Sequence, residues 1–240
     1  MKYLITIEYD GSNFYGFQRQ NNKRTVQNEI EKALTIINKA AVEIKGAGRT
    51  DKGVHAYGQK ACFNLNVTVP LDRLKKALND ILPVDIYISN CENVDDSFHP
   101  RFNVKEKTYV YKINIGNFDP LWNKYYYQMP YPLDIKKLKK ASQLFVGVHH
   151  FNNFVSGERA NYEAIIYSIK LDISKSKIII TFKGKSFYRY MVRNIVGAMI
   201  DVARNKVSLN EIKSMLDNYN DVKELSCAPA EGLYLMNIKY

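Results

Sequence analysis

Alternation of apolar and polar residues with a period of two is the feature that most constrains the fold of this chain. It recurs in five segments: 3–9, 59–67, 107–115, 177–182 and 232–240. In the first segment, every second residue from Tyr3 to Tyr9 is apolar or aromatic. Such alternation predicts β-strands with one buried face, so these segments are expected to form the sheets of the protein.

Segments with helical periodicity lie between the predicted strands. Helices are expected at residues 25–40, 70–82, 132–145, 188–204 and 209–219. In the first of them, Val26, Ile30 and Leu34 recur at helical spacing, and Thr25 is a suitable N-cap. The elements do not follow the regular strand–helix–strand order of a doubly wound sheet. We therefore expect an α+β fold, with mostly antiparallel sheets and helices on one face.

Two of the predicted helices begin with the same sequence, Pro-Leu-Asp, and each continues with a lysine-rich face. Asp72 and Asp134 lie near the helix starts, where a carboxylate interacts favourably with the helix dipole. This internal echo indicates two similar halves. Residues 114–124 are rich in Asn, Gly and Pro and mark the junction, so the halves are predicted as 1–114 and 115–240.

The charge of the chain indicates a polyanionic partner. Lys and Arg number 35 against 24 Asp and Glu, which gives a net charge of +11. Such an excess is typical of proteins that bind nucleic acid or an anionic membrane surface. The 18 Tyr and 11 Phe residues would suit unstacked RNA bases. The alternative is that Tyr is simply frequent here, as Lys, Asn and Ile are, and composition alone does not decide between the two.

The sequence predicts a cytoplasmic protein. Its three cysteines are far apart and form no CxxC pair, which argues against a disulfide framework. The apolar residues before Glu8 are too few for a signal peptide. The most apolar helical stretch is interrupted by Asp201, so no membrane association is expected.

No cofactor motif is present in the sequence. The histidines form no HExxH motif and no ligand spacing with the cysteines, so no metal is expected. The stretch GAGRTDKG at 46–53 matches neither a P-loop nor a dinucleotide-binding loop, and no GxSxG occurs. Neither a nucleotide cofactor nor a serine nucleophile is therefore predicted.

Asp51 is the main candidate for a catalytic group. Arg49 and Lys52 flank it in sequence, and both would favour its ionised form. Glycines 46, 48 and 53 permit positive φ and close approach of a ligand. An ionised aspartate in a basic cleft can act as nucleophile or base towards a sugar carbon or a base ring. The alternative is an Asp-Lys-Gly surface turn, which the spacing alone favours.

Two further residues admit a structural and a functional interpretation. Arg193 lies at the edge of the apolar stripe of helix 188–204, where it needs an anion such as Asp51 or must reach water. Tyr109 shares a strand face with isoleucines. It is either a core tyrosine or a ring that stacks on a base.

Several motifs, taken together, resemble the TruA-type tRNA pseudouridine synthases. They are EYDGSNFYGFQRQ, TVQNEIEKAL, GAGRTDKGVHAYGQ, FHPRFNVKEKTYVYKI, FYRYMVRNIVGAMIDVA and EGLYL, in order from residue 8 to residue 235. The resemblance implies the pseudouridine synthase fold, with a central cleft. It also implies isomerisation of uridine in the anticodon stem-loop of tRNA, at about positions 38 to 40, by a homodimer without metal or organic cofactor.

The resemblance assigns roles to individual residues. It implies that Asp51 is the catalytic aspartate, that Arg193 pairs with it, and that Tyr109 stacks on the target uracil. Arg49 is implicated in displacing the target base from the stem. Whether the aspartate attacks C1′ or removes the C2′ proton stays open. His150 stands where the family commonly has an acidic residue, which leaves one RNA contact undetermined.

Other basic residues are expected to contact RNA phosphates. They are Lys52, Lys183, Lys185 and the lysines at 136, 137, 139 and 140. Two alternatives to the tRNA isomerase remain at this point. One is a non-catalytic tRNA-binding or folding protein on the same scaffold, and the other is an unrelated carboxylate enzyme with a small anionic substrate.

Overall fold

The computed structural model describes residues 1–158, 160–217 and 224–240. The chain divides into two compact units. Unit 1 comprises Met1–Lys105 and Tyr234–Tyr240, and unit 2 comprises Glu106–Leu233. The α+β class and the predominance of antiparallel strands are confirmed.

The division between the units differs from the predicted halves, 1–114 and 115–240. It falls between Lys105 and Glu106, because the strand that follows pairs over its whole length with a strand of unit 2. Residues Tyr234–Tyr240 return to unit 1, where their strand pairs with His55 and Ala56. Neither long-range pairing is visible in local composition.

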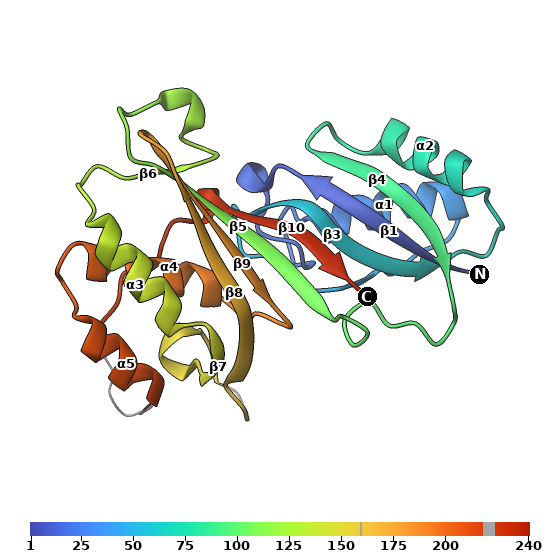
Figure 1. Ribbon diagram of the computed structural model, residues 1–240. Helices are drawn as coiled ribbons and strands as arrows, with labels where there is room; N and C mark the ends of the chain where they lie inside the picture. Colours follow the sequence, from blue (N-terminus) through green and yellow to red (C-terminus); the bar gives the residue numbers. More distant parts are fainter. Residues whose placement is uncertain (159, 218–223) are drawn as a thin grey trace. The chain divides into compact units, whose positions relative to one another are not determined.

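In unit 1, a sheet in the order β4-β1-β3-β10 carries two helices (Figure 1). Its strands are β1 (Lys2–Tyr9), β2 (Lys45–Gly46), β3 (His55–Asn64), β4 (Ile86–Val94) and β10 (Leu233–Lys239). β1 is antiparallel to both β3 and β4, β10 is parallel to β3, and β2 pairs with β3. The helices are α1 (Val26–Asn38) and α2 (Leu71–Ile81), and a 3-10 helix, η1, spans Gly11–Asn13.

The helix prediction for α1 is confirmed down to its cap. The Thr25 side chain accepts a hydrogen bond from the Asn28 N–H, and Val26, Ile30 and Leu34 are fully buried. Burial of three such side chains contributes roughly 1.5–3 kcal/mol each. This hydrophobic burial holds α1 against its sheet.

In unit 2, the antiparallel sheet has the order β5-β9-β8-β7. Its strands are β5 (Glu106–Asn114), β6 (Tyr127–Gln128), β7 (Gly147–His150), β8 (Glu163–Ile173) and β9 (Lys177–Gly184). The helices are α3 (Ile135–Leu144), α4 (Met191–Ala203) and α5 (Leu209–Asp217), with short 3-10 turns η2 (Pro120–Trp122), η3 (Asn152–Phe154) and η4 (Ala230–Gly232). Figure 1 shows α3, α4 and α5 together on one side of β8 and β9.

Three predicted helix boundaries need correction. α3 begins three residues later than expected, because Asp134 is the N-cap and its carboxylate accepts the Lys137 N–H at 3.0 Å. α4 begins at Met191 because Tyr190 has a left-handed backbone, with φ of 62°. α5 ends at Asp217, and residues 218–219 of the predicted helix lie outside the described residues.

Candidate active site

Asp51 lies on the loop that connects β2 with β3, and backbone hydrogen bonds fix this loop. The Phe17 N–H donates to the Thr50 carbonyl, and the Gly53 N–H donates to the Phe14 carbonyl, both at 3.3 Å. Asp51 therefore sits between two residues whose backbones are bound to a neighbouring segment.

The backbone at Gly16 approaches the backbone of the Asp51 loop so closely that only glycine fits there. Gly16 has φ of 93°, and a Cβ added there would lie 2.5 Å from the Thr50 carbonyl oxygen. Of the three loop glycines singled out in the sequence, only Gly53 has a positive φ, 81°. Gly46 and Gly48 have no such backbone requirement. The contact between the Asp51 loop and the neighbouring segment thus has one positive-φ glycine in each of the two segments, Gly53 and Gly16.

A buried hydroxyl pair supports the residue before Asp51. The Tyr9 hydroxyl and the Thr50 Oγ1 are 2.8 Å apart and buried. Burial raises the pKa of the Tyr9 hydroxyl well above its usual value, although hydrogen bonds with Thr50 and Gln59 oppose that shift. The hydroxyl stays protonated at physiological pH and can act as donor or acceptor.

Asp51 and the two basic residues near it in sequence differ in their exposure to solvent. Asp51 is half-buried, whereas Arg49 and Lys52 are exposed. The Lys52 ammonium lies 4.4 Å from the centre of the Tyr15 ring, in cation–π contact. A positive charge is therefore held at the surface of the loop by an aromatic ring.

His55 is a structural residue that the sequence interpretation considered only as a metal ligand. It is 2% exposed, and its Nδ1 lies 3.1 Å from the Gly11 N–H and 3.2 Å from an Asp10 carboxylate oxygen. Its ring stacks on Tyr234 at 4.6 Å. His55 thereby ties the C-terminal end of the Asp51 loop to η1. No local pattern signalled this role, because the strand was predicted at 59–67 and β3 begins at His55.

Tyr109 lies on the buried face of β5 in the unit 2 sheet. It is 7% exposed, and in the β5–β9 ladder it stands opposite Phe182. Its ring meets that of Phe187 edge-to-face, with centroids 5.2 Å apart. Such an arrangement holds the ring of Tyr109 in one orientation.

Arg193 lies in the first turn of α4 and is half-buried. Its Nε–H donates to the Ala228 carbonyl at 2.7 Å, and the Ala228 N–H returns a hydrogen bond to the Arg193 carbonyl at 3.1 Å. Its guanidinium lies 4.7 Å from the centre of the Tyr190 ring. Fixing one nitrogen in this way sets the plane of the guanidinium group.

The segment Glu224–Gly232, here called the α4 strap, carries Ala228 and lies along α4. Asp201 is 3% exposed, and its carboxylate accepts the Ser226 N–H at 2.8 Å and the Ser226 hydroxyl at 2.9 Å. A Cβ added at Gly197 would lie 1.6 Å from the Ser226 carbonyl oxygen. The sequence interpretation treated Asp201 only as a charge that interrupts an apolar helix, and so missed this contact.

Lys183 and Lys185 lie at the end of β9. Lys183 stands opposite Thr108, one position from the Tyr109–Phe182 pair, so its side chain is on the other face of the sheet from Tyr109. Lys183 is half-buried and Lys185 is exposed. The two lysines and Tyr109 thus do not share one surface of the strand.

The predicted site residues fall on both units. Asp51, Arg49 and Lys52 belong to unit 1, and Tyr109, Arg193, Lys183 and Lys185 belong to unit 2. Each unit fixes its own residues as described above. The meeting of Asp51 with Arg193 and Tyr109 stays a prediction.

Residues 1–158, 160–217 and 224–240 contain neither a candidate metal-binding cluster nor a candidate membrane-spanning helix. Within these ranges, no group of three or more His, Cys, Asp or Glu side chains is arranged to hold a metal ion. No helix among the same residues is long and apolar enough to cross a membrane.

Comparison with known proteins places the chain in a family. A family model described as tRNA pseudouridine synthase matches residues 5–103 and 141–240. The tRNA pseudouridine synthase A of Thermosipho melanesiensis is 39% identical over 246 residues, covering 100% of this chain and 99% of the relative. That of Anoxybacillus flavithermus is 39% identical over 238 residues, with 98% and 97% coverage.

Among solved structures, a chain in the crystal structure of the archaeal box H/ACA sRNP Nop10-Cbf5 complex is similar at a TM-score of 0.41. The identity is 9%, and the match covers 91% of this chain and 56% of that chain. The family match and the full-length relatives confirm the resemblance drawn from the motifs. This chain belongs to the tRNA pseudouridine synthase family.

Proposed function

We propose that this protein isomerises uridine to pseudouridine in the anticodon stem-loop of tRNA, at about positions 38 to 40, with the carboxylate of Asp51. The observation that carries the proposal is a half-buried aspartate on a backbone-fixed loop, within the part of the chain that matches the family model. A fixed carboxylate can be held in reach of a sugar carbon, which catalysis of this kind requires.

The reaction conserves atoms and electrons within the nucleotide. The N1–C1′ bond of uridine breaks, the uracil turns, and a C5–C1′ bond forms. The proton on C5 is released to a base and solvent, and N1 takes up a proton. No oxidant or reductant is consumed.

Asp51 has one of two roles in these reaction steps. It attacks C1′ and forms a covalent intermediate, or it removes the C2′ proton and allows a glycal to form. Both roles require the ionised carboxylate. The proposed partner is Arg193, because its guanidinium group, whose plane the Nε–H bond to Ala228 sets, is suited to a carboxylate.

The target nucleotide must leave the stacked stem before its C1′ can be reached. Tyr109, whose ring is held against Phe187, is proposed to stack on the everted uracil. Arg49 is proposed to fill the vacated place in the stem. It is exposed, and no hydrogen bond or ion pair links it to a described residue, so no bond must break for it to move.

The remaining basic residues are proposed to contact phosphates. Lys52, supported by the Tyr15 ring, would do so beside the Asp51 loop. Lys183 and Lys185 would do so in unit 2, with Lys183 acting on the sheet face away from Tyr109.

The decisive test replaces Asp51 by asparagine, which keeps the shape of the side chain and removes its charge. We expect no release of tritium from tRNA labelled at uracil C5, with tRNA affinity within about threefold of wild type. Asp96→Asn is the matched control, because Asp96 is an exposed carboxylate in the same unit, and it should release tritium normally.

Near-normal turnover by the Asp51→Asn protein would rule out the proposed mechanism. A wild-type protein that binds tRNA but releases no tritium would instead support the alternative of a non-catalytic tRNA-binding or folding protein.

A homodimer in the cytoplasm is also proposed, from family resemblance. Sedimentation of the purified protein alone and with tRNA tests the first part. A single species with the 27.8 kDa mass of one chain in both conditions would exclude the dimer.

A further inference from the structure

We propose that α3 and the adjoining end of α4 form a second tRNA contact surface, which binds phosphates of the RNA backbone. We call it the α3 basic face, and it consists of Lys136, Lys137, Lys139, Lys140 and Arg204. It is separate from the residues proposed for the reaction. The inference rests on the proposed function, because tRNA is the polyanion that this protein would meet as its substrate.

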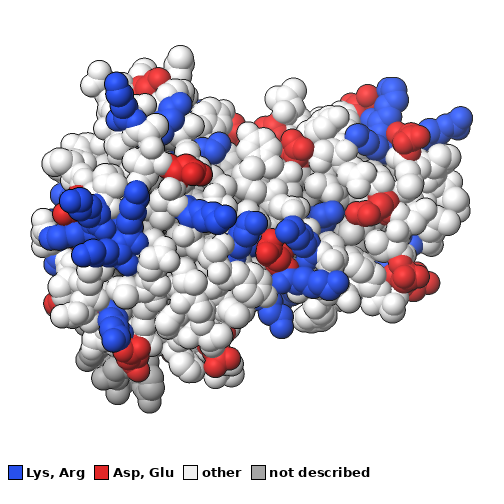
Figure 2. All heavy atoms as spheres, in the orientation of Figure 1, with Lys and Arg blue, Asp and Glu red and all other residues white. Residues whose placement is uncertain are grey.

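The sequence of α3 places all its charge on one exposed surface. Leu138 and Ala141 are fully buried, so the apolar stripe is used by the protein core. The four lysines are exposed, and α3 contains no acidic residue. Figure 2 shows Lys and Arg side chains gathered over this helix. With a rise of about 1.5 Å per residue, Lys136 and Lys140 are roughly 6 Å apart along the axis.

The helix of unit 1 that begins with the same Pro-Leu-Asp sequence pairs one of its cations with a carboxylate. In α2, Lys76 forms an ion pair with Asp80 at 2.6 Å, and Lys75 donates to the Ser89 carbonyl at 2.7 Å. α2 therefore carries its own counter-charge, which α3 lacks.

No comparable neutralisation occurs on α3. Among the described residues, no carboxylate lies within 4.0 Å of its four lysines, and Lys137 bonds to the neutral amide of Asn205. Lysines spaced three or four residues apart on a helix repel one another by about 0.2–0.5 kcal/mol per pair. A bound polyanion would remove this repulsion, so the cluster favours an anionic ligand.

The surface next to α3 forms a shallow hollow, in which Arg204 lies near Asp134, the N-cap of α3. Tyr131, Asp134, Arg204 and Asn205 are among the residues that line it. The Arg204 guanidinium lies 3.9 Å from the centre of the half-exposed Tyr131 ring. The Asp134 N–H donates to the Ala203 carbonyl at 3.0 Å, which fixes the start of α3 to the end of α4. The hollow is therefore a fixed part of the same surface.

The composition of the α3 basic face favours an RNA backbone over a protein or a membrane. A protein interface needs a buried centre rich in aromatic and apolar side chains, and a membrane-bound helix needs an apolar face to insert. In α3, Leu138 and Ala141 are already buried in the protein core. Lysine is a mobile point charge that suits phosphate contacts without base specificity.

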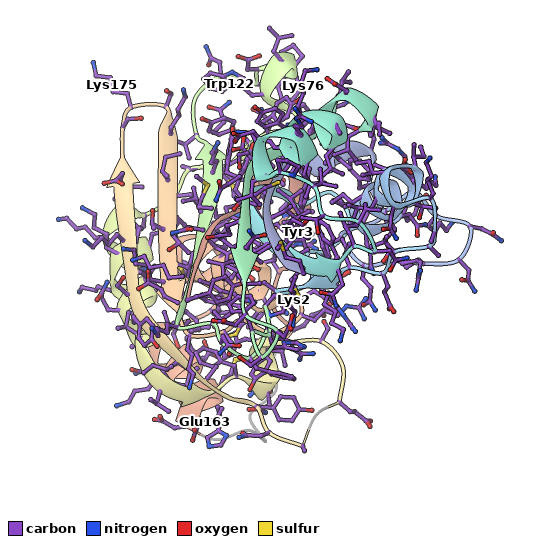
Figure 3. The ribbon with its side chains drawn as sticks, turned by 90° about the vertical axis from the view of Figure 1, so that its right-hand side faces the viewer. Lys2, Tyr3, Lys76, Trp122, Glu163 and Lys175 are labelled. Atoms are coloured by element: carbon purple, nitrogen blue, oxygen red, sulfur yellow. The ribbon has the colours of Figure 1, made fainter. Side chains whose placement is uncertain are left out.

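The experiment compares two matched double variants of the full-length protein. Lys136→Gln/Lys140→Gln alters the α3 basic face, and Arg73→Gln/Lys76→Gln alters exposed residues of α2. Each removes two positive charges and lowers the net charge from +11 to +9. Lys76 lies on the outer side of α2 (Figure 3), so its removal should not disturb packing.

The affinity for unmodified tRNA transcript is measured between 50 and 200 mM salt. The α3 double variant should bind about tenfold more weakly at 150 mM salt, and the slope of log affinity against log salt should decrease by about 1.5 to 2. The KM for tRNA in the tritium-release assay should rise by a similar factor. The α2 double variant should keep the wild-type affinity and slope.

Equal affinities and slopes for the two double variants would overturn the inference. A changed sedimentation coefficient of the α3 variant alone would also overturn it, because the face would then be a contact between copies. A wild-type protein without isomerase activity would refute the proposed function, but the binding comparison would still decide the role of the α3 basic face.

Discussion

In unit 1 the Asp51 loop is fixed by the backbone, whereas in unit 2 Arg193 is fixed by side chains and by the α4 strap. Two backbone hydrogen bonds reach the residues on either side of Asp51. Arg193 instead depends on contacts that include the Nε–H bond to Ala228 of the α4 strap, and the carboxylate of Asp201 binds Ser226 of the same strap.

This difference determines which substitutions each unit tolerates. Removing a side chain cannot delete a backbone hydrogen bond, so the Asp51 loop should survive most truncations near it. Of the contacts of the strap, both hydrogen bonds from Ser226 depend on the single carboxylate of Asp201, so a change at that residue weakens this end of the strap. We therefore expect unit 2 to be the more sensitive of the two to a single side-chain replacement.

The largest effect is expected from Gly197→Ala. Alanine has the higher helix propensity, by about 1 kcal/mol. That gain cannot offset a Cβ placed 1.6 Å from the Ser226 carbonyl oxygen, so the strap must move away from α4. We expect a loss of about 3 kcal/mol in the free energy of unfolding. Thermal denaturation should show a decrease of roughly 6 to 12 °C in Tm, and isomerase activity should be lost with the position of Arg193.

A Gly197→Ala protein with unchanged Tm and activity would show that the strap is not needed to hold Arg193. The proposed dependence of unit 2 on this segment would then be wrong.

A smaller effect is expected from Asp201→Asn. The amide can accept one hydrogen bond from Ser226, but its NH₂ group cannot accept the second. Hydrogen bonds to a charged group contribute about 1.5–3 kcal/mol, so the loss of the second Ser226 bond to this carboxylate costs about 2 kcal/mol. Urea unfolding should report this loss, and kcat should fall more than KM rises because the strap positions Arg193 and does not bind tRNA. Asp72→Asn, at an exposed residue of α2, is the control for the same chemical change.

The smallest effect is expected from Tyr9→Phe, which removes one buried hydroxyl beside the Asp51 loop. The Thr50 hydroxyl loses its partner at 2.8 Å, at a cost of about 1 kcal/mol. The backbone bonds of the loop remain, so tritium release should stay within about threefold of wild type. If Tyr9→Phe abolished activity while Asp201→Asn did not, the contrast between the two units would be reversed.

The Tyr9 hydroxyl also predicts a dependence on alkaline pH. Its pKa is raised in the folded protein, mainly by burial, so the neutral form is favoured in the folded state. The stabilisation is present below the unfolded value of about 10 and is lost as the pH rises above it. Tyr9→Phe should therefore unfold with a weaker dependence on pH than wild type between about pH 10 and 11.

The sequence predicted those strands and helix ends that depend on residues close together in the chain. The sequence pattern predicted the strands β1, β5, β9 and β10 and the Thr25 cap of α1. Strand faces and helix caps depend on residues only a few positions apart, so a local pattern reveals them. Strands β4 and β8 were missed. In β8 the register shifts between Ile166 and Ser168, and such a bulge breaks the period-two pattern.

The sequence by itself determined the fold class, the family and the identity of Asp51, Arg193 and Tyr109 as candidates, since motifs in order along a chain carry that information. The tertiary structure alone decided that Ala228 holds Arg193, that Asp201 holds the strap, and that the unit boundary follows Lys105. The physical reason is distance along the chain. These contacts join residues 25 or more positions apart, and only the packed fold brings their backbones and side chains together.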